Sequence, residues 1–438
     1  MSSLFEGFDK VSSKQWKQKI QVDLKGADYN NTLLWNSNEG ITVKPFYHYD
    51  NQVAFLEIPK VSNWKITEYI EVHETPLAIE NANKALEAGA ESVIFELHKL
   101  VNLKSIEDFA TSVTNSVFIL NKTAHFLHSE KATILQDIIG HLGASGNWYT
   151  NLKQDYEQLD YHVRNTQELV INSAHYQNAG ANIVQQVAYA LAHANEYFNH
   201  YNTKRINKVV YVNSVGGNYF FEIAKIRALR YLHKEIADSY NSIVSSCEII
   251  SLNSLRNKAI YDYNSNMLRG ATESMSAVLG GSDFICNLPY DHLYHHTNDF
   301  GNRIARNQLL ILRNESYFNP VNDVCQGAYY IEQLTQEITA KALTIFKEIE
   351  AKGGFLAQLK NGVIQRKIKE SANRQQEQFD QSEFVLVGSN KYQNNDDQMS
   401  QELEKSPFLK MNKRKTLIEP ILLKRLSENI EKERLRNE

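Results

Sequence analysis

The sequence is poor in the features that mark several protein classes. Three cysteines in 438 residues are too few for a disulfide framework, and an odd number leaves at least one unpaired. Because no CxxC or comparable spacing surrounds them, Cys247, Cys286 and Cys325 are expected to be reduced structural thiols. No apolar run approaches the roughly 20 residues of a membrane span, and no charged-then-apolar leader opens the chain. We therefore expect a cytoplasmic protein with no membrane partner.

An excess of either charge is missing as well. The chain carries 47 Lys and Arg against 51 Asp and Glu, a formal net charge of −4. Nucleic-acid binding rests on basic side chains that neutralise phosphates, so this balance argues against a nucleic-acid partner. Aliphatic and aromatic residues make up 42% of the sequence, which is enough for a sizeable core and excludes a disordered chain.

Loop motifs of common enzyme classes are also missing. The sequence has no GxxxxGK[ST] loop, no GxGxxG after a strand and no GxSxG elbow, so no motif supports a P-loop protein, a dinucleotide-binding protein or a hydrolase. The pairs Gly216-Gly217, Gly280-Gly281 and Gly353-Gly354 sit at the ends of expected elements, where turn formation explains them.

What the sequence does contain, from about residue 76, is an alternation of short apolar runs with helical stretches. This is typical of a parallel sheet covered by helices, whose strands are buried on both faces. Seven to eight such units over roughly 250–300 residues favour an α/β fold of the (β/α)8 TIM-barrel type over a doubly wound sheet. We expect strands at 92–97, 116–120, 132–135, 168–173, 208–213, 247–254, 282–288 and, as a short piece, 320–324, with helices at 76–88, 103–113, 124–129, 182–198, 219–232, 264–278 and 300–313.

Two flanks of different character surround the expected barrel domain, residues 76–375. Residues 1–75 are polar and aromatic with weak periodicity, so we expect an extended N-terminal arm that wraps a partner or packs on its own barrel. Residues 376–438 are expected to form a charged, partly helical C-terminal extension, because Leu422, Leu426 and Ile430 recur at helical spacing.

One histidine stands where the chemistry of such a barrel is located, at the C-terminal ends of the strands. His175 follows the expected strand 168–173. Two roles are open for it: a general acid or hydrogen-bond donor to a substrate carbonyl, or a structural histidine.

Other histidine groups are weaker candidates. The segment 291–296 contains Asp291, His292, His295 and His296, but it is a polar loop without the HExxH order, so no metal site is expected there. His125 and His128 would share one face of the expected helix 124–129, and nothing near them in the sequence completes a site.

Longer segments resemble the methylmalonyl-CoA mutase family. The similarity is carried by residues 220–232, 264–283, 300–312, 327–338, 346–355 and 387–392, and it resembles the small, β-type subunit in residues 38–47, 135–148 and 173–181. It extends from about residue 5 to 435. The resemblance implies a barrel whose axis is threaded by the pantetheine chain of an acyl-CoA, and a separate flavodoxin-like domain for adenosylcobalamin, the cofactor that supplies the radical chemistry.

The resemblance carries few of the family's active-site residues onto this chain. Catalytic subunits have a Tyr-His pair where this chain has Ala174-His175, and their acyl-CoA-reading R-x-H-x-Q segment aligns with residues 248–252, which keep none of the three. The DPYxN and DPxGGSYY patterns align with 262–266 and 322–330 without their prolines. His175 is therefore at most a vestigial catalytic residue, and no other catalytic, cofactor or metal residue is assigned.

The resemblance also implies that the cofactor lies elsewhere. The family's cobalamin loop is D-x-H-x-x-G, and the nearest match, Asp160-Tyr161-His162, lacks the glycine. About 45 residues follow the segment 387–392, fewer than a domain needs. We expect no cofactor on this chain and adenosylcobalamin in a partner subunit.

These implications favour a small, non-catalytic subunit of a heterodimeric methylmalonyl-CoA mutase, a cobalamin-dependent isomerase that is active only as a complex with a large catalytic subunit. The alternative is the acyl-CoA-binding half of a split mutase that borrows a cobalamin domain from another chain. A third hypothesis is an unrelated barrel enzyme that uses His175 as its acid.

Overall fold

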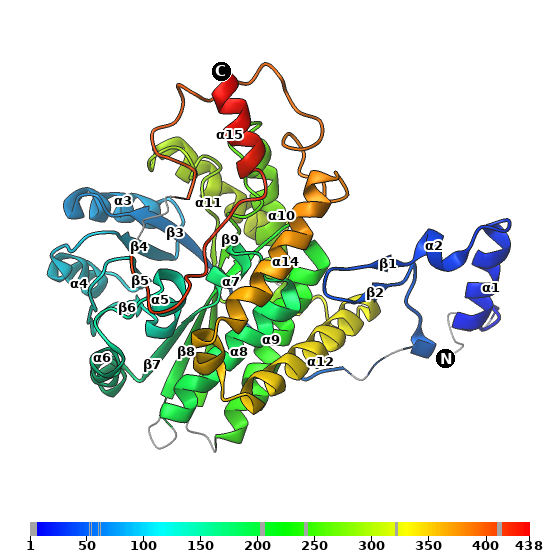
Figure 1. Cartoon of the computed structure of the whole chain (residues 1–438), viewed down its shortest axis with the longest axis horizontal. Coiled ribbons are helices and arrows are strands. Elements are labelled where there is room, and N and C mark those ends of the chain that lie inside the picture. The colour runs from blue at the N-terminus through cyan, green and yellow to red at the C-terminus, as the bar shows by residue number, and fades with distance from the viewer. Residues whose placement is uncertain are drawn as a thin grey trace.

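Eight parallel strands form a sheet that is nearly closed into a barrel and is surrounded by helices (Figure 1). This architecture was obtained as a computed structural model, which describes residues 7–51, 53, 55–59, 61, 63–201, 206–240, 244–319, 323–409 and 414–438. The strands are β3 (Lys65–Glu71), β4 (Ser92–Leu97), β5 (Ser116–Asn121), β6 (Thr133–Leu135), β7 (Glu168–Asn172), β8 (Ile206–Val215), β9 (Val244–Asn253) and β10 (Phe284–Cys286). The prediction of a (β/α)8 barrel is confirmed.

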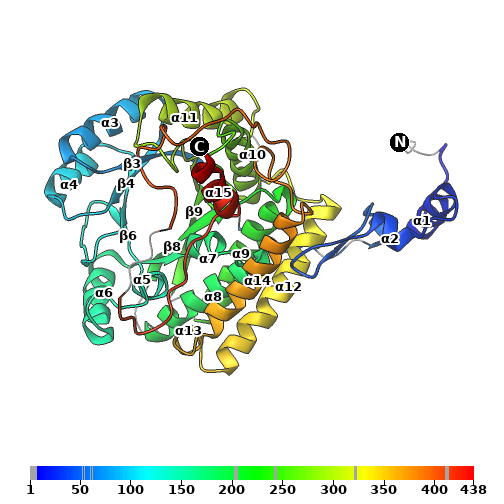
Figure 2. The same ribbon diagram turned by 45° about the horizontal axis from the view of Figure 1, so that its top comes forward.

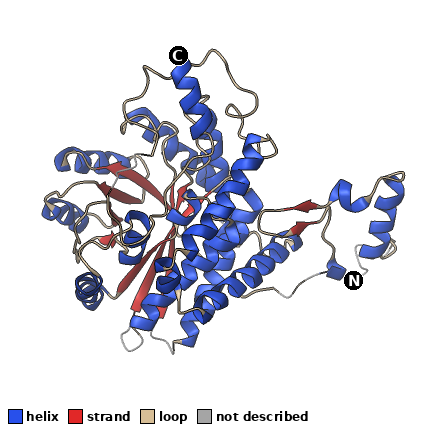
Figure 3. Ribbon diagram, in the orientation of Figure 1, coloured by secondary structure: helices blue, strands red, loops and turns tan. Residues whose placement is uncertain are grey.

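Helices cover the outside of the sheet, so that the strands lie inside a helical shell (Figure 3). The shell comprises α3 (Thr75–Glu87), α4 (Leu103–Ser112), α5 (Ile138–Ser145), α6 (Leu152–Thr166), α8 (Ile183–His200), α9 (Tyr219–Ser239), α10 (Ser265–Gly280) and α11 (Asp299–Asn314), while the short α7 (Ala174–Asn178) follows directly after β7 at the end of the barrel. A further layer formed by α12 (Tyr329–Ala351), α13 (Phe355–Lys360) and α14 (Val363–Asp380) packs outside α8 and α9 (Figure 1). In the described part of the chain, none of the helices combines the length and apolar composition that crossing a bilayer requires.

The order of strands around the barrel is β6-β5-β4-β3-β10-β9-β8-β7, so the sheet has a seam between β6 and β7. A buried carboxylate spans this seam: Asp137, which follows β6, accepts a hydrogen bond from the backbone N–H of Asn172 on β7 at 2.8 Å. At the other end of the seam, Lys208 on β8 bridges the two strands, since its ammonium lies 3.5 Å from the Thr133 hydroxyl of β6 and 2.5 Å from the Glu168 carboxylate of β7. Side chains therefore connect the two strands that the backbone ladder leaves apart.

Most expected elements are present within a few residues of their predicted bounds, and the exceptions are these. Of the C-terminal helix expected from Leu422, Leu426 and Ile430, only Ile430 is helical, in α15 (Glu428–Asn437), because the backbone before it bonds to loops and helices of the barrel instead. Strand β3 was not expected, and it places Lys65–Glu71, which lie within the range assigned to the arm, in the middle of the sheet. The expected helix 124–129 does not form, because Asn121 and Thr123 bond to the His125 carbonyl and hold a loop instead. Of the expected strand 320–324, residues 320–322 lie outside the described residues, and Asp323 and Val324 form a turn.

The N-terminal arm projects away from the barrel (Figures 1 and 2). It contains α1 (Ser13–Asp23), α2 (Tyr29–Leu33), the short hairpin of β1 (Trp35–Asn36) with β2 (Thr42–Val43), and a 3-10 turn at Tyr49–Asn51. The hairpin is its anchor on the barrel, since Ile41 is buried in the main core. Helix α1 buries none of its residues.

Candidate functional site

The interior of the barrel is filled by its own side chains. The inward-facing residues form one buried apolar cluster: Tyr69, Ile94, Phe118, Leu120, Leu135, Val170, Val210, Val212, Ile250, Phe284 and Cys286. Phe118 and Phe284, on nearly opposite strands, meet edge to face with ring centroids 4.8 Å apart. A packed axis at this level is typical of a barrel whose interior is core rather than channel.

The mouth of the barrel, where the strands end, is crossed by the segment 415–427, which we call the C-terminal strap (Figure 2). Its backbone N–H groups donate to carbonyls of the loops and helices that follow β6, β7 and β9. The bonds run from Ile421 to Gly143 at 2.8 Å, from Lys424 to Asn178 at 3.1 Å and from Leu426 to Arg256 at 2.9 Å. Ile418, Ile421 and Leu426 are buried beneath it. The strap is therefore an integral part of the mouth.

His175, the vestigial catalytic candidate, is a contact of this strap. It lies on α7, directly after β7, and its Nε2 is 2.6 Å from the carbonyl oxygen of Ile421. Burial lowers the pKa of His175 to about 4, so the ring is neutral at pH 7 and donates its Nε2–H to that carbonyl. The structure thus commits the Nε2–H of this histidine to the strap.

A buried network at the seam was missed by sequence reasoning. Asp137 Oδ1 accepts hydrogen bonds from Tyr197 Oη at 2.6 Å and from His193 Nε2 at 3.0 Å, and His193 Nδ1 in turn lies 2.8 Å from Tyr176 Oη. Burial opposes ionisation, yet His193 and the N–H of Asn172 hold the pKa of Asp137 below its ordinary value. All of these side chains are buried, so the network fastens α8 to the seam. His193 and Tyr197 share helix α8, but Asp137 and Tyr176 come from other elements, so no local motif could have identified the network.

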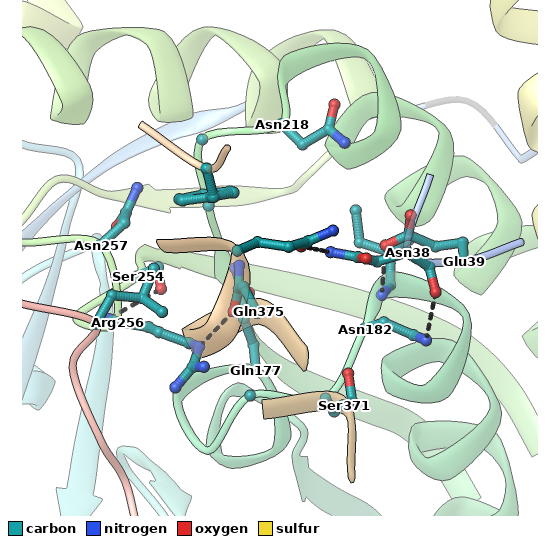
Figure 4. A pocket seen from close by; sticks show the side chains of 18 of the residues that line it. Asn38, Glu39, Gln177, Asn182, Asn218, Ser254, Arg256, Asn257, Ser371 and Gln375 are labelled. Atoms are coloured by element: carbon teal, nitrogen blue, oxygen red, sulfur yellow. Dashed lines mark hydrogen bonds between the residues drawn. The ribbon is translucent and has the colours of Figure 1, made fainter. Parts of the chain in front are cut away.

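A cavity of about 360 Å³ lies beside the mouth, next to the ends of β7, β8 and β9 (Figure 4). The hairpin of the arm, the turn Gly216-Gly217 and helix α14 complete its walls. Polar side chains dominate its lining: Asn38, Glu39, Gln177, Asn182, Gln186, Asn218, Glu222, Arg256, Asn257, Gln375 and Gln378. The sequence did not predict this polar lining, because its residues come from five separate segments; only the neighbouring pair Gly216-Gly217 was singled out, as a turn.

Most polar groups of this cavity are already paired within the protein. Arg256 donates from Nε to Gln375 at 2.7 Å and from Nη1 to the Lys424 carbonyl of the strap at 2.7 Å, and burial lowers its pKa to about 10. Asn38 donates to Gln378 at 2.8 Å and so joins the arm to α14. The cavity therefore serves as a polar junction of the arm, the barrel and the strap.

The remaining cysteines and histidines that the sequence singled out lie in the following places. Cys247, Cys286 and Cys325 carry no disulfide, as expected. His128 bonds to Gln158 at 2.8 Å on the outside of the barrel, whereas His125 is exposed. In the loop after β10, His295 pairs with Asp291 at 3.2 Å, while His292 and His296 turn toward the end of β3.

The D-x-H match does not form a cobalamin loop. Asp160, Tyr161 and His162 lie inside helix α6, and His162 is buried in its packing. Burial lowers the pKa of His162 to about 4. An imidazole in this position is unable to reach a cobalt ion outside the helix, so this segment does not fit the family's cobalamin loop.

Comparisons with known proteins agree with this architecture. The family model for methylmalonyl-CoA mutase matches residues 106–434. The chain is 29% identical to the methylmalonyl-CoA mutase small subunit of Porphyromonas gingivalis, over 89% of this chain and 71% of that protein. It is 28% identical to the methylmalonyl-CoA mutase of Cereibacter sphaeroides, over 86% of this chain and 64% of that protein. The large subunit of the P. gingivalis mutase is 26% identical, over 78% of this chain and 45% of that protein.

The eight-stranded parallel barrel, matched by this family model over most of the chain, defines the class of the protein. The chain belongs to the methylmalonyl-CoA mutase family. Its similarity covers a larger share of the small subunit than of the large subunit or of the Cereibacter protein, of which it spans 64%.

Proposed function

We propose that this chain is the non-catalytic small subunit of a heterodimeric, cytoplasmic methylmalonyl-CoA mutase. In this proposal it packs against a large catalytic subunit, which holds adenosylcobalamin and interconverts methylmalonyl-CoA and succinyl-CoA, and it stabilises that subunit. The observation that carries the proposal is the filled barrel axis, where the rings of Phe118 and Phe284 meet at a centroid distance of 4.8 Å, because the family resemblance implies an axis open to the pantetheine chain of an acyl-CoA.

The strap supports the same conclusion from the other end of the barrel. An acyl-CoA substrate and a cobalamin would have to meet at the mouth, and there the strap is bonded to the elements after β6, β7 and β9. His175, the one family residue kept at the site, is bonded to the strap rather than directed at an open cavity. Enzymes stabilise a transition state mainly through polar groups that are directed at the reacting atoms. Here the retained polar group, His175, is hydrogen-bonded to the protein's own backbone.

The partner is proposed from the relatives and from the arm. P. gingivalis has proteins named as the small and the large subunit, and this chain is similar to both. The arm offers apolar side chains to a neighbour, since Val11, Trp16 and Val22 are all about half exposed or more. Exposed apolar surface of this kind is typical of protein interfaces. We propose that the arm and the strap-covered barrel contact the large subunit.

Co-expression tests the partner role. The tagged chain and a large subunit from the same genome should purify as a stable 1:1 complex, and the large subunit alone should be less soluble or less stable to heat. Failure of the two chains to co-purify would reject the proposal.

Titration of the isolated chain with methylmalonyl-CoA tests the non-catalytic role separately. We expect no binding at acyl-CoA concentrations of about 100 µM. A dissociation constant in the micromolar range, about −8 kcal/mol, would instead favour the acyl-CoA-binding half of a split mutase.

A further inference from the structure

Two neighbouring strands end with the same pattern, Glu-x-His, at the mouth of the barrel. Strand β3 ends in Glu71 and is followed by His73, and strand β4 contains Glu96 and is followed by His98. The two glutamates are register partners in the parallel ladder. Each side chain is only 7–8% exposed, and each faces the histidine two residues later, at 3.4 Å on β3 and 2.9 Å on β4.

A third segment adds two more imidazoles at β3 only. The loop after β10 places His292 Nδ1 at 3.7 Å from Glu71 and sets the His296 ring edge-on to the His73 ring, with centroids 5.3 Å apart. One ligating atom each from Glu71, His73 and His296 lie within 4.8 Å of one another. Throughout the described ranges, no other set of three His, Cys, Asp or Glu side chains meets this criterion.

The carboxylate of this group is held in place by its neighbours. Lys405 donates to Glu71 Oε1 at 2.7 Å, while Oε2 is the oxygen that faces His73. Lys405 is itself fixed, since its backbone N–H donates to the Tyr294 carbonyl at 3.0 Å. Groups that orient a ligating side chain in this way are typical of metal sites, because they reduce the cost of arranging the ligands.

The loop that carries His296 is fastened as well. The N–H of His296 donates to the Glu404 carboxylate at 2.7 Å, so the same segment, residues 404–405, positions both the carboxylate and the distant histidine. The two imidazole rings remain accessible from solvent, since the His73 side chain is 58% exposed and His296 is exposed. An ion could therefore reach the group without opening the fold.

We propose that Glu71, His73 and His296 form a binding site for one divalent transition-metal ion, with Zn²⁺ as the best fit. Two imidazoles and one carboxylate are the three-ligand set of zinc sites that keep an open fourth position. Imidazole ligands disfavour the hard cations Mg²⁺ and Ca²⁺, which select oxygen. The bound ion would join β3 to the loop after β10. The site is independent of the proposed function.

Calorimetric titration of Zn²⁺ into the full-length chain, first freed of metal with EDTA, tests the site. We expect one ion per chain with a dissociation constant on the order of 1 µM or tighter. His73→Ala and His296→Ala should each weaken binding by about tenfold or more. His98→Ala is the matched control, because it removes the same pattern from the neighbouring strand, and it should change the affinity by less than about threefold. Absence of binding to the unaltered chain, or an equal loss in His98→Ala, would overturn the assignment.

A second measurement separates loss of a ligand from loss of the fold. Glu71→Gln keeps an oxygen for Lys405 but removes the charge that a metal requires, so it should abolish tight binding while the circular dichroism spectrum stays unchanged. Co²⁺ added to the unaltered chain should give the intense visible absorption of a low-coordinate site, and this signal should vanish in Glu71→Gln. A Glu71→Gln chain that still binds Zn²⁺ with unaltered affinity would refute the site.

Discussion

The carbonyl oxygen of Ile421 lies 2.6 Å from Nε2 of His175, a residue 246 positions earlier in the chain. This bond connects the first turn after β7 to the C-terminal strap. The bond gives His175, the one histidine that the family resemblance retains here, a structural role at the mouth. Removal of the His175 side chain should therefore affect stability rather than turnover.

His175→Ala should lower the free energy of unfolding by about 1–3 kcal/mol, because it leaves the buried Ile421 carbonyl without its donor. Urea denaturation measures this, and His125→Ala, at an exposed histidine, is the control that should change little. The turnover of the complex with a large subunit should stay nearly unchanged. A fall of more than about a hundredfold, or 2.7 kcal/mol, would show that His175 acts in catalysis after all.

Stability should fall as the pH drops below about 6.5. Burial lowers the pKa of His141 and His175 to about 4, and that of His233 to about 3. Between an unfolded value near 6.5 and these folded values, the unfolded chain takes up protons that the folded chain excludes, whereas above about pH 6.5 these groups have no effect.

Urea midpoints at about pH 7.5, 6 and 5 measure this dependence. His233→Phe removes one of the groups, and it should flatten the curve by up to 1.4 kcal/mol per pH unit, even though Tyr211 loses a hydrogen-bond partner at 3.0 Å. A midpoint that is constant from about pH 7.5 to 5 would contradict the expectation.

Phe118→Ala and Phe284→Ala should each destabilise the protein by about 3–5 kcal/mol, because truncation of a buried ring leaves a cavity on the barrel axis. The two effects should not add, since the rings touch at a centroid distance of 4.8 Å. Phe220→Ala, at a side chain that is 48% exposed, should cost less than about 1 kcal/mol. Equal losses in all three variants would mean that the axis is not a packed core.

Truncation of the arm before Leu34 should separate partner binding from folding. It removes α1 and α2 but keeps the hairpin, whose Ile41 is buried in the main core. Because α1 buries none of its residues, the melting temperature of the isolated chain should change by less than about 2 °C.

The same truncation should abolish co-purification with the large subunit. Replacing both Trp16 and Val22 by serine is the milder variant, and it should weaken the complex without altering the isolated chain. A truncated chain that still forms the complex with full affinity would show that the arm does not contact the partner.

The sequence was sufficient for the barrel because most of its strands read as continuous apolar runs. Ser92–Leu97 is buried at every position, and its mostly apolar sequence clearly predicts a buried strand. The sequence did not predict strand β3, because charged residues, Lys65 and Glu71, occupy the inward-facing positions at its two ends. The segment Lys65–Glu71 therefore reads as polar and alternating. Charges at the two ends of a barrel strand face the barrel openings, and no local pattern distinguishes them from an exposed arm.

The sites were harder to predict than the fold, for a related reason. The sequence shows metal-ligand types at 291–296, but the other members of the proposed group, Glu71 and His73, lie at and just after the end of the first strand of the barrel, more than 200 positions away. The same holds for Asp137, whose partner His193 lies 56 residues further on. Only the order of strands around the barrel, with β10 beside β3, brings such residues together.

The strap also has a consequence for the order of events during synthesis. Residues 415–427 follow every strand of the sheet, so the ribosome releases them after the barrel has been delivered. Until then the nascent protein exposes the apolar surface that Ile418, Ile421 and Leu426 later cover. Uncovered surface of this kind invites aggregation or capture by chaperones. For this protein, the nascent barrel can therefore bury this apolar surface only once the strap has been translated.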